Sequence, residues 1–287
     1  MDPNRNYPKL LHFRKNSALQ SYSCRVECLA MSDNLKHRLD VAAGAAWEAG
    51  KLTLRYFQTR LQVELKGDRT PVTVADREAE ELLHGILTRE FPGDAFLGEE
   101  RGERPGTSGY RWVIDPIDGT KSFIQGVPLY GVLVGLEDPA GEAVLGVVNI
   151  PGLGEIVAAA RGEGCSWNGR RARVSPVASL KEACVAYTSH KTFEDTKRTS
   201  AFERVRARCR ICRGWGDCYG HILVATGRAE AMLDPILADW DCAALLPILE
   251  EAGGTFTDWS GSRTVRGKSG VSTNGKVHSE LFAVLGA

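Results

Sequence analysis

Two carboxylates, a proline and a glycine stand close together in the segment Asp115-Pro-Ile-Asp-Gly-Thr120 of this 287-residue chain. The apolar residues before it, Trp112-Val-Ile114, predict a short buried strand, which the proline should end because it has no backbone N–H for a ladder. The turn should bring Asp115, Asp118 and the Ile117 carbonyl oxygen to one side. A hard divalent cation such as Mg²⁺ prefers such oxygens. The segment therefore predicts a metal site, and the alternative is a solvated Asp-Gly surface turn.

The residues after these carboxylates predict a place for an anion. Gly119 and Thr120 could open a helix through Lys121-Ser-Phe123, and the exposed backbone N–H groups at such a start bind negative charge. An anion held there would lie beside the predicted cation. Because Mg²⁺ usually keeps a substrate phosphate among its ligands, the two predicted sites belong together.

Further acids stand at the ends of other predicted elements. Glu99 follows a predicted buried strand, Ala95-Phe-Leu-Gly98, just as Asp115 follows its own strand. Two adjacent strands would place these acids together. Asp76 starts one predicted helix and Asp241 starts another, where a carboxylate is favourable in any case. For Asp241, capping a helix and binding a metal are compatible.

Periodicity predicts the elements that must position these residues. Ser32 could cap a first helix that ends near Phe57. Pro247 falls inside a helix predicted from Trp240 to Glu251 and should bend it. In the second half, strands and helices alternate, which indicates α/β layering. The expected strands span 130–136, 143–150, 155–161, 183–189, 208–214, 230–234, 255–259 and 271–274, and further helices span 76–91, 193–207, 217–226 and 277–285.

We expect three parts along the chain. Residues 1–30 show no sustained period and predict a disordered leader, so the folded part should begin near Met31. Residues 31–175 should form an N-terminal α+β half that carries the metal site. Residues 176–287 should form a C-terminal α/β half that carries the segment determining substrate specificity.

The charge balance argues against two classes of partner. Lysine plus arginine and aspartate plus glutamate both total 36, so the net charge of zero gives no general attraction to nucleic acid or to an anionic membrane. No apolar run reaches the roughly 20 residues that a membrane span needs, and no charged-then-apolar signal peptide opens the chain. A cytoplasmic location is therefore expected.

The eight cysteines are too sparse for a disulfide scaffold. Cys209-Arg-Ile-Cys212 has the spacing of a redox or zinc motif, but it lacks a second such pair or a nearby pair of histidines. We expect its cysteines to pack in a strand. The sequence contains neither a phosphate-binding Walker loop nor residues in the order of a Ser-His-Asp triad. It therefore gives no sign of these other hydrolytic chemistries.

Three segments in this order resemble the inositol monophosphatase family of Mg²⁺-dependent phosphatases: Gly98-Glu-Glu100, Asp115-Pro-Ile-Asp-Gly-Thr120, and Trp240-Asp-Cys-Ala-Ala244 through Glu251-Ala-Gly-Gly254. The resemblance extends from Met31 to the end of the chain. It implies an α+β fold, a layered αβαβα sandwich of the inositol monophosphatase and fructose-1,6-bisphosphatase type. It also implies hydrolysis of a small-molecule phosphate ester by a homodimer.

The resemblance implies a complete set of site residues. It assigns Glu99, Asp115 and the Ile117 carbonyl to one metal, Asp115, Asp118 and Asp241 to a second, and Asp76 with Glu99 to a third, weaker site. It assigns Thr70, Asp76 and Thr120 to orienting or deprotonating the attacking water, and the N–H groups of Gly119 and Thr120 to holding the phosphate. Independently, five clustered carboxylates require neutralisation, because like charges in one pocket raise each other's pKa. Two to three Mg²⁺ ions per site would provide it.

The second half resembles the branch that hydrolyses L-histidinol phosphate in histidine biosynthesis. The resemblance rests on residues 118–130, 214–220 and 223–228. Asp217 and Asp234 could bind the cationic amine or imidazole of that substrate, and His221 could line the same pocket. Asp217 could instead cap a helix. Inositol phosphate or another sugar monophosphate is the alternative substrate, and a non-catalytic regulatory protein of the same fold is the alternative class.

Overall fold

The structure is a computed structural model that describes residues 22–60, 62–67 and 71–286, with only the backbone described for 22–34. Helix α1 spans Tyr22–Thr53. The prediction that Ser32 caps it is wrong, because the helix already runs through Ser32, and no proline or glycine interrupts the ten residues before it. Of the predicted disordered leader, residues 1–21 lie outside the described residues, and the remainder belongs to α1.

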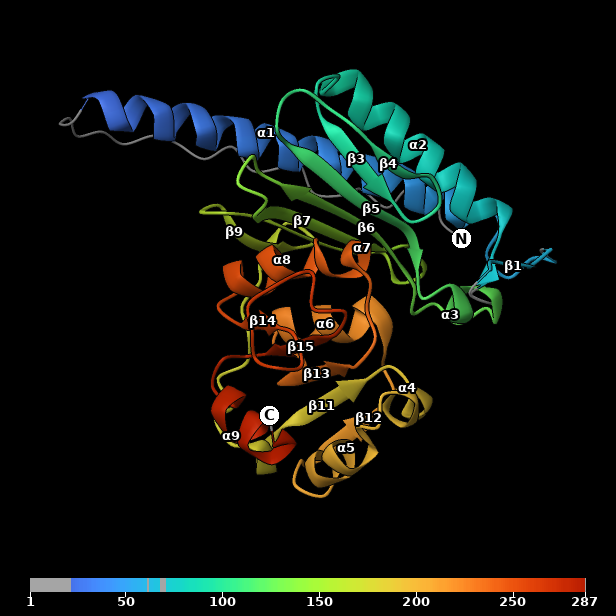
Figure 1. The fold of residues 1–287 in the computed structure, drawn as a ribbon, viewed down its shortest axis with the longest axis vertical. Helices are drawn as coiled ribbons and strands as arrows, with labels where there is room; N and C mark the ends of the chain where they lie inside the picture. The colour runs from blue at the N-terminus through green and yellow to red at the C-terminus, as the bar shows by residue number, and fades with distance from the viewer. Residues whose placement is uncertain (1–21, 61, 68–70, 287) are drawn as a thin grey trace.

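The larger sheet has eight strands in the order β10-β9-β8-β7-β6-β5-β3-β4. Its neighbours are antiparallel except β3 and β5, which are parallel. The strands are β3 Ala95–Gly98, β4 Gly102–Arg104, β5 Arg111–Asp118, β6 Gly131–Glu137, β7 Ala143–Ile150, β8 Glu155–Ala160, β9 Gly164–Trp167 and β10 Arg170–Arg171. Helices α1 and α2 (Val74–Glu90) cover one face (Figure 1), where alanines of α1 and leucines of α2 pack against Trp112 and the apolar side chains of β6 and β7.

The smaller sheet has five strands in the order β12-β11-β13-β15-β14. They are β11 Cys184–Tyr187, β12 Ile211–Arg213, β13 Ala231–Asp234, β14 Thr255–Thr257 and β15 Gly270–Thr273. Strands β12, β11 and β13 run parallel, whereas β15 is antiparallel to both of its neighbours. A two-stranded hairpin of β1 (Glu64–Leu65) and β2 (Pro71–Val72) precedes α2.

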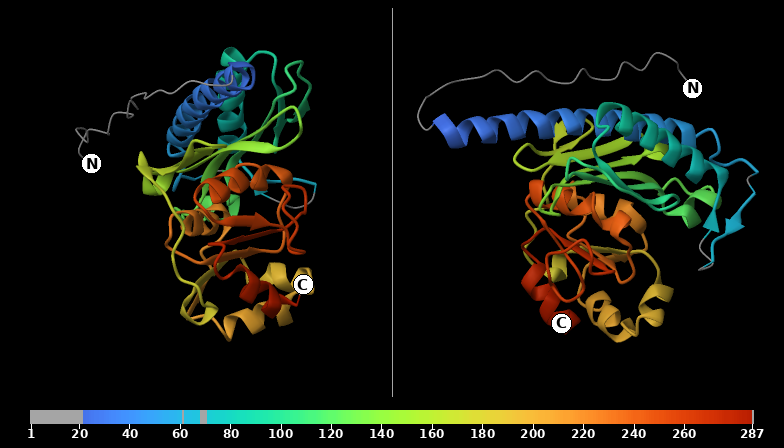
Figure 2. Two further views of the ribbon diagram at one scale, coloured as in Figure 1. Left: turned by 90° about the vertical axis from the view of Figure 1, so that its left-hand side faces the viewer. Right: turned by 45° about the horizontal axis from the view of Figure 1, so that its top comes forward.

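Helices fill the space between the two sheets and cover the outer face of the smaller one, as the views in Figures 1 and 2 show. The middle layer contains α6 Asp217–Ala225, α7 Asp239–Cys242 and α8 Leu245–Glu251, and the outer layer contains α4 His190–Asp195, α5 Thr199–Arg206 and α9 His278–Leu285. The short helices are α3 Thr120–Ile124, η1 Pro151–Leu153 and η2 Leu180–Glu182. The order of layers is helix, sheet, helix, sheet, helix, so the predicted αβαβα sandwich is confirmed.

The helix predicted from Trp240 to Glu251 is divided into α7 and α8. Pro247 is the third residue of α8, in the first turn, where a backbone N–H has no partner within the helix. Ala243, four residues before Pro247, keeps right-handed helical angles at the point where α7 ends, so the division falls where the proline cannot donate a backbone bond. The predicted bend of the helix stays a prediction.

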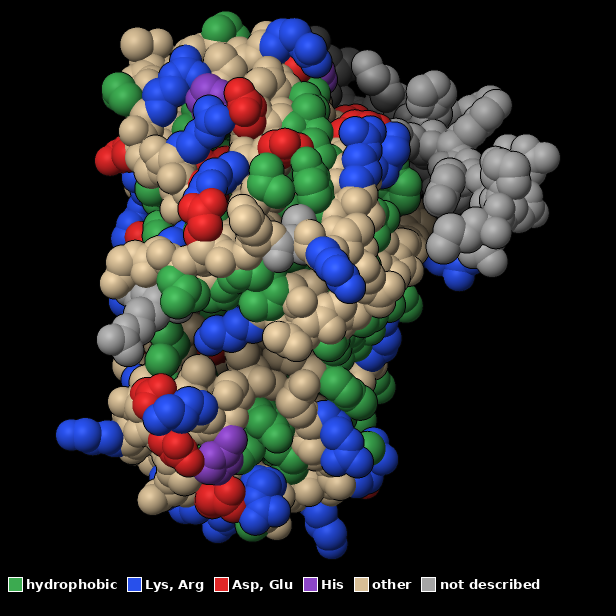
Figure 3. Space-filling view, turned by 90° about the vertical axis from the view of Figure 1, so that its right-hand side faces the viewer, with side chains coloured by type: hydrophobic (Ala, Val, Ile, Leu, Met, Phe, Trp, Pro, Cys, Tyr) green, Lys and Arg blue, Asp and Glu red, His purple; other side chains and the backbone are tan. Residues whose placement is uncertain are grey.

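The predicted boundary between the halves at residues 175 and 176 falls between β10, the last strand of the larger sheet, and β11, the first strand of the smaller one. Their division into separate folding units stays a prediction. Among the described residues, no helix is both long and apolar enough to cross a membrane. Figure 3 shows acidic and basic side chains interspersed over the face in view, in keeping with the net charge of zero.

Candidate active site

Strand β5 carries the two central carboxylates on a bulge. It pairs with β6 through Asp115↔Leu133 and then through Asp118↔Gly131, with a register shift between the two pairs. The prediction that proline ends this strand is wrong in detail, because the bulge takes up the residue that cannot donate a ladder bond. A bulge bends a strand and changes the direction of its side chains. Asp115 and Asp118 both reach the edge of the sheet that faces α7.

A parallel neighbour brings Glu99 to the same place. Strand β3 pairs with β5 through Gly98↔Ile114, and the Glu99 N–H donates to the Ile114 carbonyl at 3.3 Å. Glu99, which follows the end of β3, therefore lies next to Asp115 of the adjacent parallel strand, so the two acids are together, as the sequence predicted.

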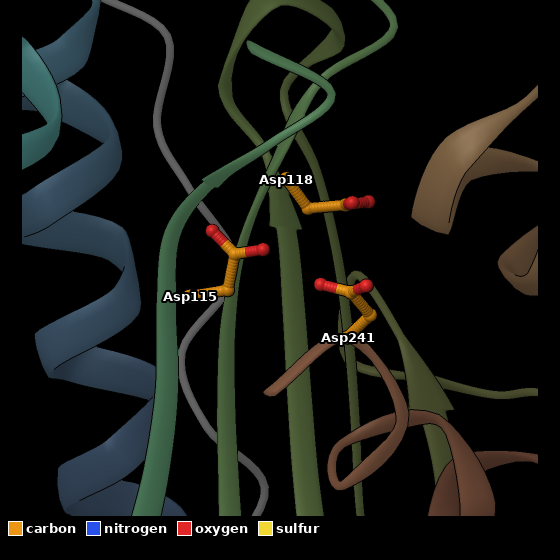
Figure 4. A group of neighbouring side chains, drawn as sticks. All are labelled: Asp115, Asp118 and Asp241. Atoms are coloured by element: carbon orange, nitrogen blue, oxygen red, sulfur yellow. The ribbon is translucent and has the colours of Figure 1, made fainter. Parts of the chain in front are cut away.

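Asp115, Asp118 and Asp241 form an acidic cluster in which one oxygen of each lies within 4.8 Å of the others. Figure 4 shows the three side chains converging from β5 and the start of α7. Each is oriented by a backbone N–H: Asp115 accepts from Ile117 at 3.0 Å, Asp118 from Cys218 at 2.5 Å and Asp241 from Ala238 at 2.7 Å. The contact of Asp241 is part of a cap on α7, so this residue orients a helix and joins the cluster as well.

Burial and mutual repulsion disfavour the charged forms of this cluster. Burial, followed by the charges of Glu99 and Asp118, raises the pKa of Asp115 well above its usual value. Burial and the charge of Asp241 raise the pKa of Asp118 to about 7, and burial is also the main cause that raises the pKa of Asp241 to about 6. Among the described residues, no lysine or arginine forms an ion pair with these three carboxylates. A divalent cation coordinated by carboxylate and carbonyl oxygens fits this donor set.

Asp76 supplies a further carboxylate from the first turn of α2. Its Oδ2 accepts from the backbone N–H and the hydroxyl of Thr73, at 2.8 Å and 2.6 Å. Its Oδ1 is buried and has no hydrogen-bond partner among the described residues, and burial raises the pKa of Asp76 to about 6. The alternative prediction, that Asp76 stabilises the start of the helix, is confirmed for its Oδ2 atom. The other oxygen remains for a metal or a water molecule.

Glu80 positions the loop that carries Glu99, and the sequence analysis missed it. One turn after Asp76 on α2, the buried Glu80 carboxylate accepts from the backbone N–H groups of Glu100 and Arg101, at 2.8 Å and 2.9 Å. A Cβ at Gly98 would lie 2.3 Å from Glu80 Oε1, so only glycine permits this approach. The available signal was the spacing of four between two acids, which places both on one helix face.

Lys66, also missed, supplies the cation that the structure places nearest to Glu99. Its Nζ lies 2.7 Å from Glu99 Oε1 and 2.6 Å from Glu100 Oε1. Lys66 belongs to the hairpin segment before α2 and therefore partly neutralises this edge of the site. The predicted catalytic Thr70 lies outside the described residues.

Helix α3 begins at the predicted anion site. Gly119 is its N-cap, with φ +83°, a left-handed conformation that favours glycine. The Thr120 hydroxyl donates to the Ile117 carbonyl at 3.1 Å, so this carbonyl is held in place beside the carboxylates. The predicted start of a helix at these residues is confirmed, and the binding of phosphate to their N–H groups stays a prediction.

Asp217 lies against this turn, although it is about a hundred residues away in sequence. A Cβ at Gly119 would lie 2.9 Å from Asp217 Oδ2, and the Ser122 hydroxyl donates to the same oxygen at 3.4 Å. Burial and the charge of Asp118 raise the pKa of Asp217 to about 7. The alternative that Asp217 caps α6 is wrong, because Gly216 is the N-cap and no side chain caps this helix.

Asp234 supports Asp217 through one hydroxyl group. Thr188 Oγ1 donates to Asp234 Oδ2 at 2.5 Å and accepts from the Asp217 backbone N–H at 3.1 Å. Asp234 is only 2% exposed, and burial raises its pKa well above the usual value. A direct contact between Asp234 and substrate stays a prediction. His221 does not line the site, because it is buried against Ser272 at 2.6 Å and burial lowers its pKa to about 3.

Comparison with known proteins agrees with this geometry. Residues 34–285 match the family model described as the inositol monophosphatase family. A histidinol-phosphatase of Chlorobaculum parvum is 48% identical over 86% of this chain and 96% of its own length. A histidinol-phosphatase of Streptomyces coelicolor is 38% identical over 88% and 95%. The crystal structure of the extragenic suppressor protein suhB from Bartonella henselae superposes with a TM-score of 0.81, at 32% identity, covering 87% of this chain and 98% of that one.

The chain therefore belongs to the inositol monophosphatase family. Membership of this family, together with the acidic cluster, makes it a phosphatase.

Proposed function

We propose that this phosphatase hydrolyses L-histidinol phosphate to L-histidinol and inorganic phosphate, a step of histidine biosynthesis, with two to three Mg²⁺ ions. The observation that carries the substrate assignment is the position of Asp217. A buried carboxylate lies directly against the Gly119 turn, where the proposed phosphate site would bring the rest of the substrate. Similarity to the two histidinol-phosphatases supports the same assignment.

The proposed metal ligands are carboxylate and carbonyl oxygens that the fold already orients. They are Glu99, Asp115 and the Ile117 carbonyl for one ion, Asp115, Asp118 and Asp241 for a second, and Asp76 with Glu99 for a third. When bound, Mg²⁺ would neutralise the phosphate and lower the pKa of a water molecule toward neutrality. The raised pKa values of the cluster support this assignment, because burial and the neighbouring carboxylates disfavour the charged forms, and a bound cation would offset both.

The protein's own groups would bind the phosphate and take up a proton. Gly119 is the left-handed N-cap of α3, and the N–H groups of Gly119 and Thr120 at this helix start would donate to phosphate oxygens. Asp76 Oδ1, buried and without a partner, is the acceptor that we assign to the attacking water. The Thr120 hydroxyl, which donates to the Ile117 carbonyl, is the group that we assign to orienting this water.

Asp217 would distinguish a cationic alcohol from a neutral one. Histidinol carries an amine and an imidazole, whereas inositol carries only hydroxyl groups. Burial and the charge of Asp118 raise the pKa of Asp217, and a cation beside it would offset both effects. Charge-assisted hydrogen bonds are also stronger than neutral ones. Specificity of this kind depends on the difference between the binding free energies of the two substrates, and not on the affinity for either one alone.

The test compares wild type with Asp217→Asn on L-histidinol phosphate and on inositol 1-phosphate. The amide keeps the shape but removes the charge, so kcat/KM should fall at least tenfold for histidinol phosphate and much less for inositol phosphate. Asp195→Asn, at an exposed carboxylate paired only with Lys191 in the outer layer, is the matched control. An equal loss on both substrates would refute the role of Asp217 in specificity.

We also propose a cytoplasmic homodimer, following the resemblance. The interspersed surface charge supports a small-molecule substrate rather than nucleic acid. Light scattering during size-exclusion chromatography tests the dimer, and the mass of a single chain would contradict it.

A further inference from the structure

The Cys209-Arg-Ile-Cys212 segment has no part in the proposed reaction. Cys212 lies in β12, whereas Cys209 lies in the bend that precedes this strand, so the prediction that both pack in one strand is wrong for Cys209. Both thiols are free, and each side chain is half-buried.

An open pocket of about 240 Å³ lies at the opposite end of β5 from the acidic cluster. Arg111, the first residue of β5, lines this pocket, whereas Asp115 is four residues further along the strand, about 13 Å away at about 3.3 Å per residue. The pocket is also lined by Glu137 at the end of β6, by Asp138 in the turn that follows, and by Arg266 in the loop between β14 and β15. It therefore lies between the parts of the chain that form the two sheets, and it is separate from the active site.

The two carboxylates of this pocket are already bound by the protein through both of their oxygens. Glu137 is 3% exposed, and its Oε2 accepts from Arg111 Nε at 2.9 Å and from Arg111 Nη2 at 2.6 Å. Its Oε1 accepts from Arg266 Nη2 at 2.9 Å. Asp138 Oδ1 accepts from two backbone N–H groups of its own turn, and Asp138 Oδ2 accepts from Arg161 at 3.2 Å. These carboxylates therefore do not need a donor from a ligand.

The two arginines, by contrast, keep hydrogen-bond donors. Nε and Nη1 of Arg266 have no acceptor among the described residues. Nη1 of Arg111 donates only to Glu103, at 3.4 Å, and this carboxylate is 67% exposed, so the pair contributes little. Two guanidinium groups thus share the one negative charge of Glu137, since Arg161 balances the charge of Asp138. The unused donors and the excess of positive charge favour a ligand with negatively charged oxygens.

We propose that this pocket binds a small oxyanion, a ligand with a carboxylate or a phosphate group, through Arg266 and Arg111. The planar guanidinium group presents N–H donors in a fork that matches two oxygens of either group. The volume lies below the range of about 300–1,000 Å³ that is typical of sites for drug-sized ligands, so the ligand is a small one. A bound anion connects Arg111 of the larger sheet to the loop of the smaller sheet and stabilises the folded chain.

The test measures binding of two probes, succinate and inorganic phosphate, to the whole chain at pH 8 after metals have been removed with a chelating resin. Without metal, the acidic cluster repels anions and disfavours binding at the active site. Calorimetric titration at constant ionic strength should show saturable binding of at least one probe, and the probe that binds identifies the group that is recognised.

Arg266→Gln should weaken this binding by about tenfold or more, because it removes a charged donor group. Arg263→Gln is the matched control and should bind as wild type. Arg263 lies in the same loop, is 46% exposed compared with 47% for Arg266, and pairs with Glu142 and Glu250 without lining the pocket.

Hydrogen exchange followed by mass spectrometry locates the probe in wild type without any substitution. The bound probe should slow exchange in residues 106–111 and 137–141. Protection confined to residues 119–124, at the start of α3, would place the probe at the active site and overturn the proposal. The absence of saturable binding by both probes would also overturn it, as would an unchanged affinity in Arg266→Gln.

Discussion

The most informative perturbation is Asp118→Asn in protein freed of metal. Burial and the charge of Asp241 raise the pKa of Asp118 from 3.8 to about 7, so the folded state favours its protonated form. A raised folded-state pKa gives a stabilising contribution that is complete below pH 3.8 and is lost as the pH rises through about 7. The metal-free wild type should therefore lose stability between pH 4 and pH 8, and the variant should lose less.

The size of the effect follows from the same values. One pKa unit corresponds to about 1.4 kcal/mol, so a group that titrates near 7 rather than at 3.8 destabilises the metal-free protein by on the order of 4 kcal/mol at pH 8. This is an upper bound, because Asp115 and Asp241 share the repulsion. The asparagine oxygen can still accept from the Cys218 N–H. We expect the variant to be more stable than wild type by about 2 kcal/mol at pH 8.

The assay is urea unfolding, followed by tryptophan fluorescence, at pH 5 and pH 8 in the presence of EDTA. Asp195→Asn, far from the cluster, should follow wild type at both values. Added Mg²⁺ should stabilise wild type at pH 8, because a ligand that binds only the folded state stabilises it, and should stabilise Asp118→Asn less. If Asp118→Asn were less stable than wild type in EDTA at pH 8, the reasoning about uncompensated charge would be refuted.

Three further substitutions test the supports of the site. Glu80→Gln keeps only one good acceptor for two backbone N–H groups, so it should lower the free energy of unfolding by about 1–3 kcal/mol. It should also weaken Mg²⁺ binding, measured by calorimetry. The control Glu81→Gln, at an exposed neighbour, should change neither quantity. Gly119→Ala should cost about 1–2 kcal/mol in urea unfolding and reduce kcat, because φ is +83° and its Cβ would meet Asp217. Thr188→Val removes the hydroxyl donor to the buried Asp234 carboxylate, which keeps only the Ile236 N–H at 3.4 Å, and should raise KM for histidinol phosphate more than it lowers kcat.

Each of these has its own contrary outcome. Unchanged Mg²⁺ affinity in Glu80→Gln would mean that the loop carrying Glu99 is held by other contacts. Wild-type kinetics in Gly119→Ala would show that the turn tolerates a side chain and is not closely fitted around phosphate. A fall in kcat without a change in KM for Thr188→Val would move this residue from substrate binding to the chemical step.

The convergence of the acids was predictable because it depends on local pattern and on one topological rule. Apolar runs that end in acid at Glu99 and Asp115 predict strands, and parallel pairing of two such strands brings their ends together. The helix starts at Asp76 and Asp241 were recognisable from the same local chemistry, since carboxylates are favourable there. The alternation of strands and helices in the second half indicated α/β layering there, whereas the five-layer order was implied by the family resemblance.

Other features depended on contacts that local pattern does not encode. Proline normally ends a strand, and only the neighbouring strand β6 shows that a bulge absorbs it instead. The roles of Glu80 and Thr188 come from backbone N–H groups 20 and 29 residues away, to which no periodicity points. The division between α7 and α8 was missed because the apolar pattern continues across it.

The central claim is tested most directly by measuring phosphate release from L-histidinol phosphate and from inositol 1-phosphate, each with Mg²⁺ and with EDTA. The account predicts Mg²⁺-dependent release with kcat/KM at least tenfold higher for histidinol phosphate, and none in EDTA. A preference for inositol phosphate, or release that persists in EDTA, would contradict it.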